Sequence, residues 1–124
     1  MCMLKLSSKL YAKEDIVCYK ILRELSIDGI MTLKSFYHNY KWVIGKHERA
    51  SRSKARYGDN IHDGYFHSYR EIPKELPSFK PSFDAIPVIY KCIIPKGSLY
   101  YKGIHSDALD GYCSKSLIVT EKIL

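Results

Sequence analysis

Several short runs of apolar, β-branched and aromatic residues, separated by turn residues, occur along the chain, and they indicate β-strands. The clearest segment runs from Ile86 to Ile94 between two prolines, and both of its faces are apolar. We therefore expect a central strand in which Cys92 is buried and reduced. Further strands are predicted at Asp15–Leu22, Lys41–Gly45, Tyr65–Tyr69 and Ser116–Leu124.

A tight turn is predicted directly after the central strand, at Pro95–Ser98. Proline fixes its own φ near −65°, and Gly97 is free to adopt a positive φ. The next apolar and aromatic residues, Leu99–Lys102, are expected to return along the central strand as its hairpin partner.

Helical signals are short and lie at two places. Ser7 or Ser8 is suited to cap a turn or two that continues to Lys13, and Ser68 or Tyr69 leads into a second short segment, Arg70–Leu76. The expected fold class is therefore α+β, a mostly antiparallel sheet of about five strands with one or two short helices. We expect residues 1–124 to form a single domain.

Composition indicates in which cellular compartment this domain is expected. The apolar runs are far shorter than the roughly 18 to 20 residues that a membrane span requires. The N-terminal residues do not follow the pattern of a secretion signal, so we expect a cytoplasmic protein with no membrane partner. The cysteines, Cys2, Cys18, Cys92 and Cys113, are far apart in sequence, which favours reduced thiols over zinc knuckles or redox pairs.

The positive charge of the chain is concentrated in one segment. The net charge is +7, and Lys46–Arg56 holds five basic residues against one acid. Such a segment is either a solvated surface loop or an arm that contacts phosphates, with flanking aromatic rings that stack on bases. In the second interpretation the binding residues are Trp42, Lys46, Arg49, Arg52, Lys54, Arg56 and Tyr57.

Candidate catalytic and metal-binding residues are scattered. Ser68 and His67 are neighbours on a predicted strand and should point to opposite faces, so they are not expected to form a nucleophile and base pair. Cys2 would become N-terminal on removal of Met1, but no self-cleavage signal accompanies it. We expect loop histidines, no metal site and no cofactor, although imidazole and carboxylate groups suited to zinc or manganese occur at His62, His67, His105, Asp63, Asp107 and Asp110.

A series of short motifs spans most of the chain: Cys18-Tyr19-Lys20, Trp42–Lys46, Gly64–Tyr69, Lys91–Ser98, Tyr100–Gly103 and Tyr112–Lys115. In this order they resemble a family of small uncharacterised proteins encoded by bacteriophages and mobile elements of gut bacteria. Where the family has Gly-Phe-His, this chain has Gly64-Tyr65-Phe66-His67. The family has no established activity, so the resemblance implies a phage setting and nothing catalytic.

Three predicted strands carry, in chain order, Tyr19-Lys20, Ser68 and Glu121. This order gives a weaker resemblance, to ADP-ribosyltransferases, whose cores run from an aromatic-Arg strand through an aromatic-Ser strand to a strand that bears glutamate. Lys20 stands where the pattern has arginine, and an ammonium does not replace the planar, bidentate guanidinium.

Two functions follow. The favoured one is a non-enzymatic phage accessory module that binds an anionic partner: nucleic acid, nucleotide or an acidic host protein, with counter-defence as one setting. The alternative is an ADP-ribosyltransferase-like enzyme that acts on a nucleotide. A cleft that gathers Tyr19, Ser68 and Glu121 would favour the enzyme.

Overall fold

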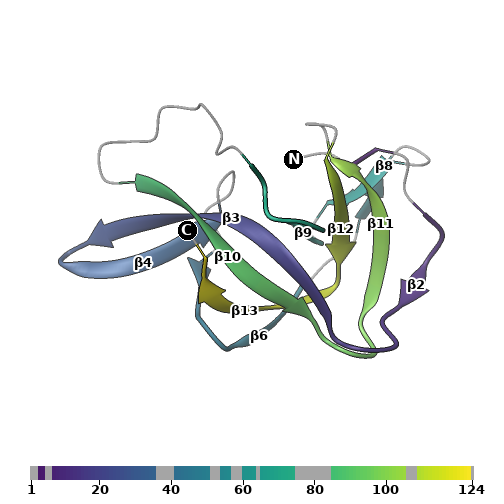
Figure 1. The fold of residues 1–124 in the computed structure, drawn as a ribbon, viewed down its shortest axis with the longest axis horizontal. Helices are drawn as coiled ribbons and strands as arrows, with labels where there is room; N and C mark the ends of the chain where they lie inside the picture. Colours follow the sequence, from purple (N-terminus) through teal and green to yellow (C-terminus); the bar gives the residue numbers. More distant parts are fainter. Residues whose placement is uncertain are drawn as a thin grey trace.

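Strands make up all the regular secondary structure in the described part of the chain (Figure 1). The computed structural model describes residues 3–4, 7–35, 41–50, 54–56, 60–63, 65–74, 85–105 and 109–123; for 3–4, 27, 54–56, 60–63 and 85 only the backbone is considered. The strands are β1 (Met3–Leu4), β2 (Leu10–Tyr11), β3 (Ile16–Ile27), β4 (Ile30–Ser35), β5 (Lys41–Trp42), β6 (His47–Arg49), β7 (Lys54–Arg56), β8 (Asn60–Asp63), β9 (Phe66–Tyr69), β10 (Ala85–Ile94), β11 (Leu99–His105), β12 (Asp110–Ser114) and β13 (Ser116–Lys122).

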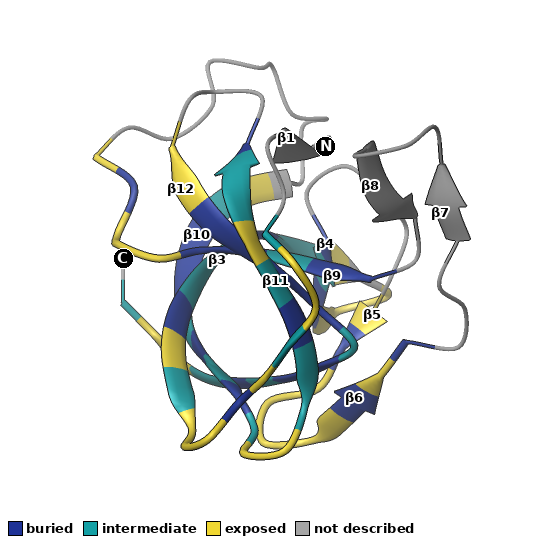
Figure 2. Cartoon of the chain, turned by 90° about the vertical axis from the view of Figure 1, so that its right-hand side faces the viewer, coloured by how far each residue is buried: buried dark blue, intermediate teal, exposed yellow. Residues whose placement is uncertain are grey.

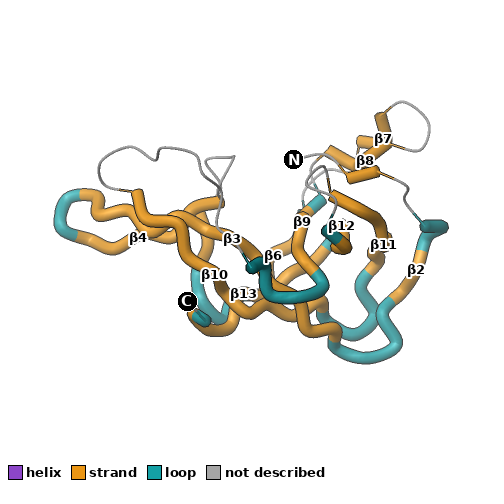
Figure 3. Tube along the Cα trace, turned by 45° about the horizontal axis from the view of Figure 1, so that its top comes forward, coloured by secondary structure: helices purple, strands orange, loops and turns teal. Residues whose placement is uncertain are grey.

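The expected α+β class is wrong, because the described residues contain no helix (Figure 3). At the first expected helix, Leu10 and Tyr11 pair instead with Tyr100 and Leu99 of β11. At the second, Ser68 and Tyr69 belong to β9, and residues 70–74 are irregular, with bends at 70, 71 and 74; residues 75–76 lie outside the described part. Hydrogen bonds to distant strands have outweighed the weak local preference for capped helical turns. No helix that could span a bilayer occurs among the described residues.

The sheet is also larger than expected. It holds 11 strands in antiparallel pairing, and β7 and β8 form a separate two-stranded sheet. Its centre is the pair of β3 and β10, which runs from Ala85 opposite Leu25 to Ile94 opposite Ile16. On the side of β3 away from β10, β4 extends the sheet at one end and β9 at the other. The short strands, only two or three residues long, account for most of the excess over the predicted number.

The predicted turn at Pro95–Ser98 is confirmed, because Ser98 N donates to the Pro95 carbonyl over 3.0 Å and Gly97 has φ 87°. The predicted hairpin is wrong. β11 pairs with β12, β1 and β2, not with β10. Both edges of β10 are already occupied by β3 and β13, so the chain that leaves the turn must pair elsewhere.

The sheet curls around one main core (Figure 2). The predicted central strand is confirmed, and its Val88, Tyr90, Cys92 and Ile94 all face this core. Cys92 is 0% exposed and lies directly opposite Cys18, which is also 0% exposed. Cys18, Cys92 and Cys113 are free thiols, as expected, and Cys2 lies outside the described residues.

β3 and β4 form a long hairpin that extends away from β11 and β12 (Figure 1). Its turn is Asp28-Gly29, with φ of 51° and 78°. Two positive φ values are typical of the type I′ turn, whose twist matches that of the flanking strands. The turn fixes the register, so that Ile27 lies opposite Ile30 and Arg23 opposite Lys34.

Candidate functional site

Three cations form a row across the outer face of β3, β4 and β5. Arg23 lies directly opposite Lys34, and Lys34 lies directly opposite Lys41. Directly opposite residues of antiparallel strands point to the same side of a sheet, and adjacent strands are about 4.8 Å apart. The three positive side chains are therefore neighbours. We call these three residues the cationic row.

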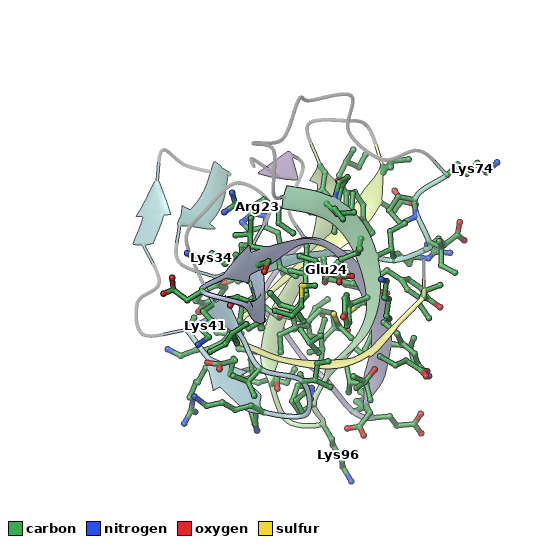
Figure 4. All side chains as sticks on the ribbon, turned by 90° about the vertical axis from the view of Figure 1, so that its left-hand side faces the viewer. Arg23, Glu24, Lys34, Lys41, Lys74 and Lys96 are labelled. Carbon is green, nitrogen blue, oxygen red and sulfur yellow. The ribbon has the colours of Figure 1, made fainter. Side chains whose placement is uncertain are left out.

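Figure 4 shows the side chains of the cationic row along one side of the molecule, whereas Lys74 and Lys96 lie far from it. Lys41 is exposed, and Arg23 and Lys34 are partly buried. Arg23 Nε donates to the Ser35 carbonyl oxygen over 2.9 Å, which holds the guanidinium group above β4.

Among the described residues, no acidic side chain occupies a register position next to the cationic row on its face of the sheet. The next register position beyond Arg23 is Pro87, on β10. The strand neighbours on the same face are uncharged as well: Ile21, Leu25 and Thr32. Like charges directly opposite each other are destabilising in an antiparallel pair. An anion placed over the row would remove this repulsion, which makes the row a candidate binding site.

The predicted basic segment is only partly described. Lys46 is exposed in the turn before β6 and pairs with Glu48 over 3.4 Å, and Arg49 is exposed on β6. Lys54 and Arg56 lie on β7, where only the backbone is considered, and Arg52 and Tyr57 lie outside the described residues. The structure thus brings Lys46 and Arg49 to the surface and leaves the remaining members a prediction.

Trp42, which was also predicted to belong to the binding site, is part of the core. It is 2% exposed and packs edge-on against Phe66, with ring centroids 4.9 Å apart. Its Nε1 donates to Ser35 Oγ over 2.8 Å. A ring in this position is not available to stack on a base.

A buried polar cluster, which the sequence reasoning did not identify as a site, lies on the inner face of β3. Lys20 shares this face with Cys18 and Leu22, and its Nζ donates to the His67 carbonyl oxygen over 2.6 Å. The ammonium group also lies 5.7 Å from the centre of the Trp42 ring. Burial lowers the pKa of Lys20, and the thiols of Cys92, Cys18 and Cys113 act in the opposite direction.

Those thiols do not supply a counter-charge at neutral pH. Burial raises the pKa of Cys18 to about 11, and it raises the pKa of Cys92 still further. Both groups therefore remain neutral, and Lys20 is held by a carbonyl oxygen and an aromatic ring rather than by a carboxylate. This arrangement binds β9 to β3; it does not resemble a metal site, and no set of three metal-ligating side chains occurs in the described residues.

The three candidate histidines, His62, His67 and His105, lie on strands, so the expectation that they are loop residues is wrong. His105 is 1% exposed on β11, and its Nε2 lies 2.6 Å from the Ser68 carbonyl oxygen. Its ring lies 5.8 Å from that of His67 and 4.7 Å from that of Tyr69. His62 lies on β8. His67 and His105 are thus part of the packing between β9 and β11.

The residues matched to the transferase pattern do not gather in one cleft. Tyr19 lies on the outer face of β3, opposite Lys91, and Glu121 pairs with that same lysine over 3.7 Å. Ser68 is 1% exposed, and its neighbour Tyr69 is the residue that lies opposite Tyr19. Because successive residues of a strand alternate in direction, Ser68 points inward, away from the face that carries Tyr19 and Glu121.

The cationic row leaves one signal in the sequence. Arg23, Lys34 and Lys41 are far apart along the chain and form no charge run. The dipeptide Asp28-Gly29 is a strong hairpin signal, and counting outward from it places Arg23 opposite Lys34. The position of Lys41 opposite Lys34 could not be predicted from the sequence, because β5 is only two residues long.

Comparisons with known proteins give no relative for this chain: no family model matches it, and no curated protein or solved structure does.

Proposed function

We propose that this chain is a non-enzymatic module that binds nucleic acid through its phosphates, with the cationic row as the described part of the contact surface. The observation that carries the proposal is the register Arg23–Lys34–Lys41, which places three like charges side by side. A polyanion neutralises this repulsion and releases counterions on binding.

The surrounding charge supports the same partner. β5, which carries Lys41, leads through a turn into Lys46 and Arg49, both exposed. The whole segment Lys46–Arg56 adds a net charge of +4 to that of the row. Since Trp42 is buried, we expect contacts to the phosphate backbone rather than stacking on bases, and hence little sequence preference.

Nucleic acid is favoured over an acidic protein because the row is polar and regularly spaced. Protein interfaces are centred on buried aromatic and apolar anchors, and the outer-face neighbours of the row are the partly buried Leu25 and the buried Ile21 and Thr32. The resemblance to phage-encoded proteins supports placing this binding in the cytoplasm of a bacterial host cell.

The test is binding of a fluorescent DNA duplex at several salt concentrations. We expect log affinity to fall steeply with log salt, and replacement of Lys34 and Lys41 by glutamine to flatten the slope by up to about 1.8. The matched control replaces Lys74 and Lys96, which are exposed and distant from the row, with the same change of charge.

A second variant tests the predicted basic segment separately. Replacing Arg49, Arg52, Lys54 and Arg56 by alanine should flatten the salt slope by about 3 to 4. Poly-glutamate serves as the competitor. Absence of binding at low salt, or displacement by poly-glutamate as effective as by unlabelled DNA at equal charge, would overturn nucleic acid as the partner.

A further inference from the structure

A hollow of about 380 Å³ lies over β11 and β12, which Figure 1 shows side by side at the end of the molecule away from the β3–β4 hairpin. Its volume falls in the range of small-molecule sites. It is separate from the cationic row and from the buried cluster around Lys20. The lining residues are Ser7, Arg70, Lys102, Gly103, Ile104, Asp110, Gly111 and Tyr112.

Hydrogen bonds hold together the backbone segments that carry the charged residues of the hollow. Lys102 lies directly opposite Tyr112 on the neighbouring strand, so the exposed lysine and the buried tyrosine lie on the same side of the sheet. Ser7 N donates to the Lys102 carbonyl over 2.8 Å, and Lys102 N donates to Ser7 Oγ over 3.0 Å. Arg70 N donates to the Asp110 carbonyl over 3.1 Å. The backbone of the hollow is therefore ordered, whereas the exposed side chains of Lys102, Arg70 and Asp110 are ordered when a ligand binds.

The hollow offers two cations and one acid. Lys102 is exposed and forms no ion pair with a described residue, whereas Arg70 and Asp110 form a long, exposed ion pair with 3.8 Å between Nη1 and Oδ2. The Tyr112 hydroxyl stays protonated at neutral pH, because burial raises its pKa. Gly103 and Gly111 lie directly opposite each other, and His105 packs against Gly111 where a side chain would otherwise stand.

We propose that this hollow binds a phosphorylated sugar, either free or as part of a nucleotide. Lys102 and Arg70 hold the phosphate group, as cations and charge-assisted donors. Asp110 accepts hydrogen bonds from the sugar hydroxyls, because an ionised carboxylate is a strong acceptor. An anion without hydroxyl groups cannot donate such bonds. The volume exceeds what a phosphate ion fills, and the acid disfavours a ligand that consists of negative charge alone.

The proposal is tested by calorimetric titration of the whole chain with ribose 5-phosphate, AMP, inorganic phosphate and ribose. We expect the two phosphorylated sugars to bind, inorganic phosphate to bind more weakly, and ribose not to bind. Tighter binding of AMP assigns the site to nucleotides and equal binding assigns it to sugar phosphates; both support the proposal. Failure of both phosphorylated sugars to bind at millimolar concentration overturns it.

Single substitutions distinguish binding in the hollow from a general effect of the protein's net charge. Lys102→Gln and Arg70→Gln should each weaken ribose 5-phosphate binding by about tenfold or more, while Lys96→Gln, an equal change of charge at an exposed turn, should not. Asp110→Asn should reduce the preference for ribose 5-phosphate over inorganic phosphate. Equal weakening by Lys96→Gln contradicts the proposal. Lys34→Gln and Lys41→Gln should leave this binding unchanged, so the outcome is independent of DNA binding.

Discussion

Lys20 Nζ donates a hydrogen bond of 2.6 Å to the carbonyl oxygen of His67, across the boundary between β3 and β9. The two strands share a single register pair, Tyr19 with Tyr69. The hydrogen bond from the lysine side chain therefore adds a second link between β3 and β9. To form it the ammonium group is buried, and burial disfavours the charged form.

Lys20→Met should change how stability depends on pH. The pKa of Lys20 is lowered in the folded protein from 10.5, so the unfolded chain binds more protons between the lowered value and 10.5. The free energy of unfolding of the wild type therefore rises with pH across that window relative to the methionine variant. Below the window Lys20 is charged in both states, and the full cost of burying its ammonium lowers the stability of the wild type. Urea unfolding of both proteins at several pH values up to 10.5 measures the difference, which a constant offset would contradict.

Cys18 should have the opposite effect on stability at alkaline pH: it should make the wild type less stable as the pH rises. Burial raises its pKa from 9.0 to about 11, so the unfolded thiol ionises first. The stabilisation present below pH 9.0 is lost as the pH rises to about 11, by up to about 3 kcal/mol for a shift of this size. Cys18→Ala should remove this loss. A wild type and variant with parallel alkaline profiles would show that Cys18 is not the group responsible.

The three buried thiols should react only when the protein opens. In a Cys2→Ser background the remaining cysteines are Cys18, Cys92 and Cys113, each 0% exposed. Labelling by a thiol reagent should therefore proceed at the rate of local or global unfolding. Cys92→Ser should lower stability by about 1–3 kcal/mol, since it buries a hydroxyl, and Cys92→Ala serves as the comparison. Rapid native-state labelling contradicts the burial.

Gly111→Ala should destabilise the pairing of β12 with its neighbours. A Cβ at this position would lie 1.9 Å from His105 Nε2 and 2.4 Å from the Ser68 carbonyl oxygen, so the backbone must move. We expect a loss of about 1–3 kcal/mol or more. Gly29→Ala provides the contrast, because it meets nothing within 4 Å and adds only the strain of φ +78°. Thermal unfolding compares them, and an unchanged midpoint for Gly111→Ala would count against the packing.

Lys34→Gln should stabilise the free protein while it weakens DNA binding. Removal of the central charge relieves repulsion with both Arg23 and Lys41, which is worth about 0.2–1 kcal/mol for cross-strand pairs. The gain should vanish at high salt, where the charges are screened. Lys74→Gln should show no gain at either salt concentration. A variant that loses both stability and binding would indicate a structural role for Lys34 instead.

The long apolar strands were predictable from the sequence. Residues 86–94 and 116–122 are apolar on both faces over enough positions to specify a strand buried between other elements, as the burial of Cys92 and Val119 shows. The turn at Pro95–Ser98 was equally predictable, because it depends on the dihedral preferences of two adjacent residues. Net charge and the spacing of the cysteines are likewise properties of the chain itself.

Only the tertiary structure decided which strands pair and which charges meet. β2 and β5 are two residues long, too short for a periodic pattern, and they exist through hydrogen bonds to β11 and β4. The same pairing turns Leu10 and Tyr11 from an expected helix into a strand and places Lys41 beside Lys34. Hydrogen bonds between distant strands depend on how the whole chain packs, so local residue preferences cannot specify them.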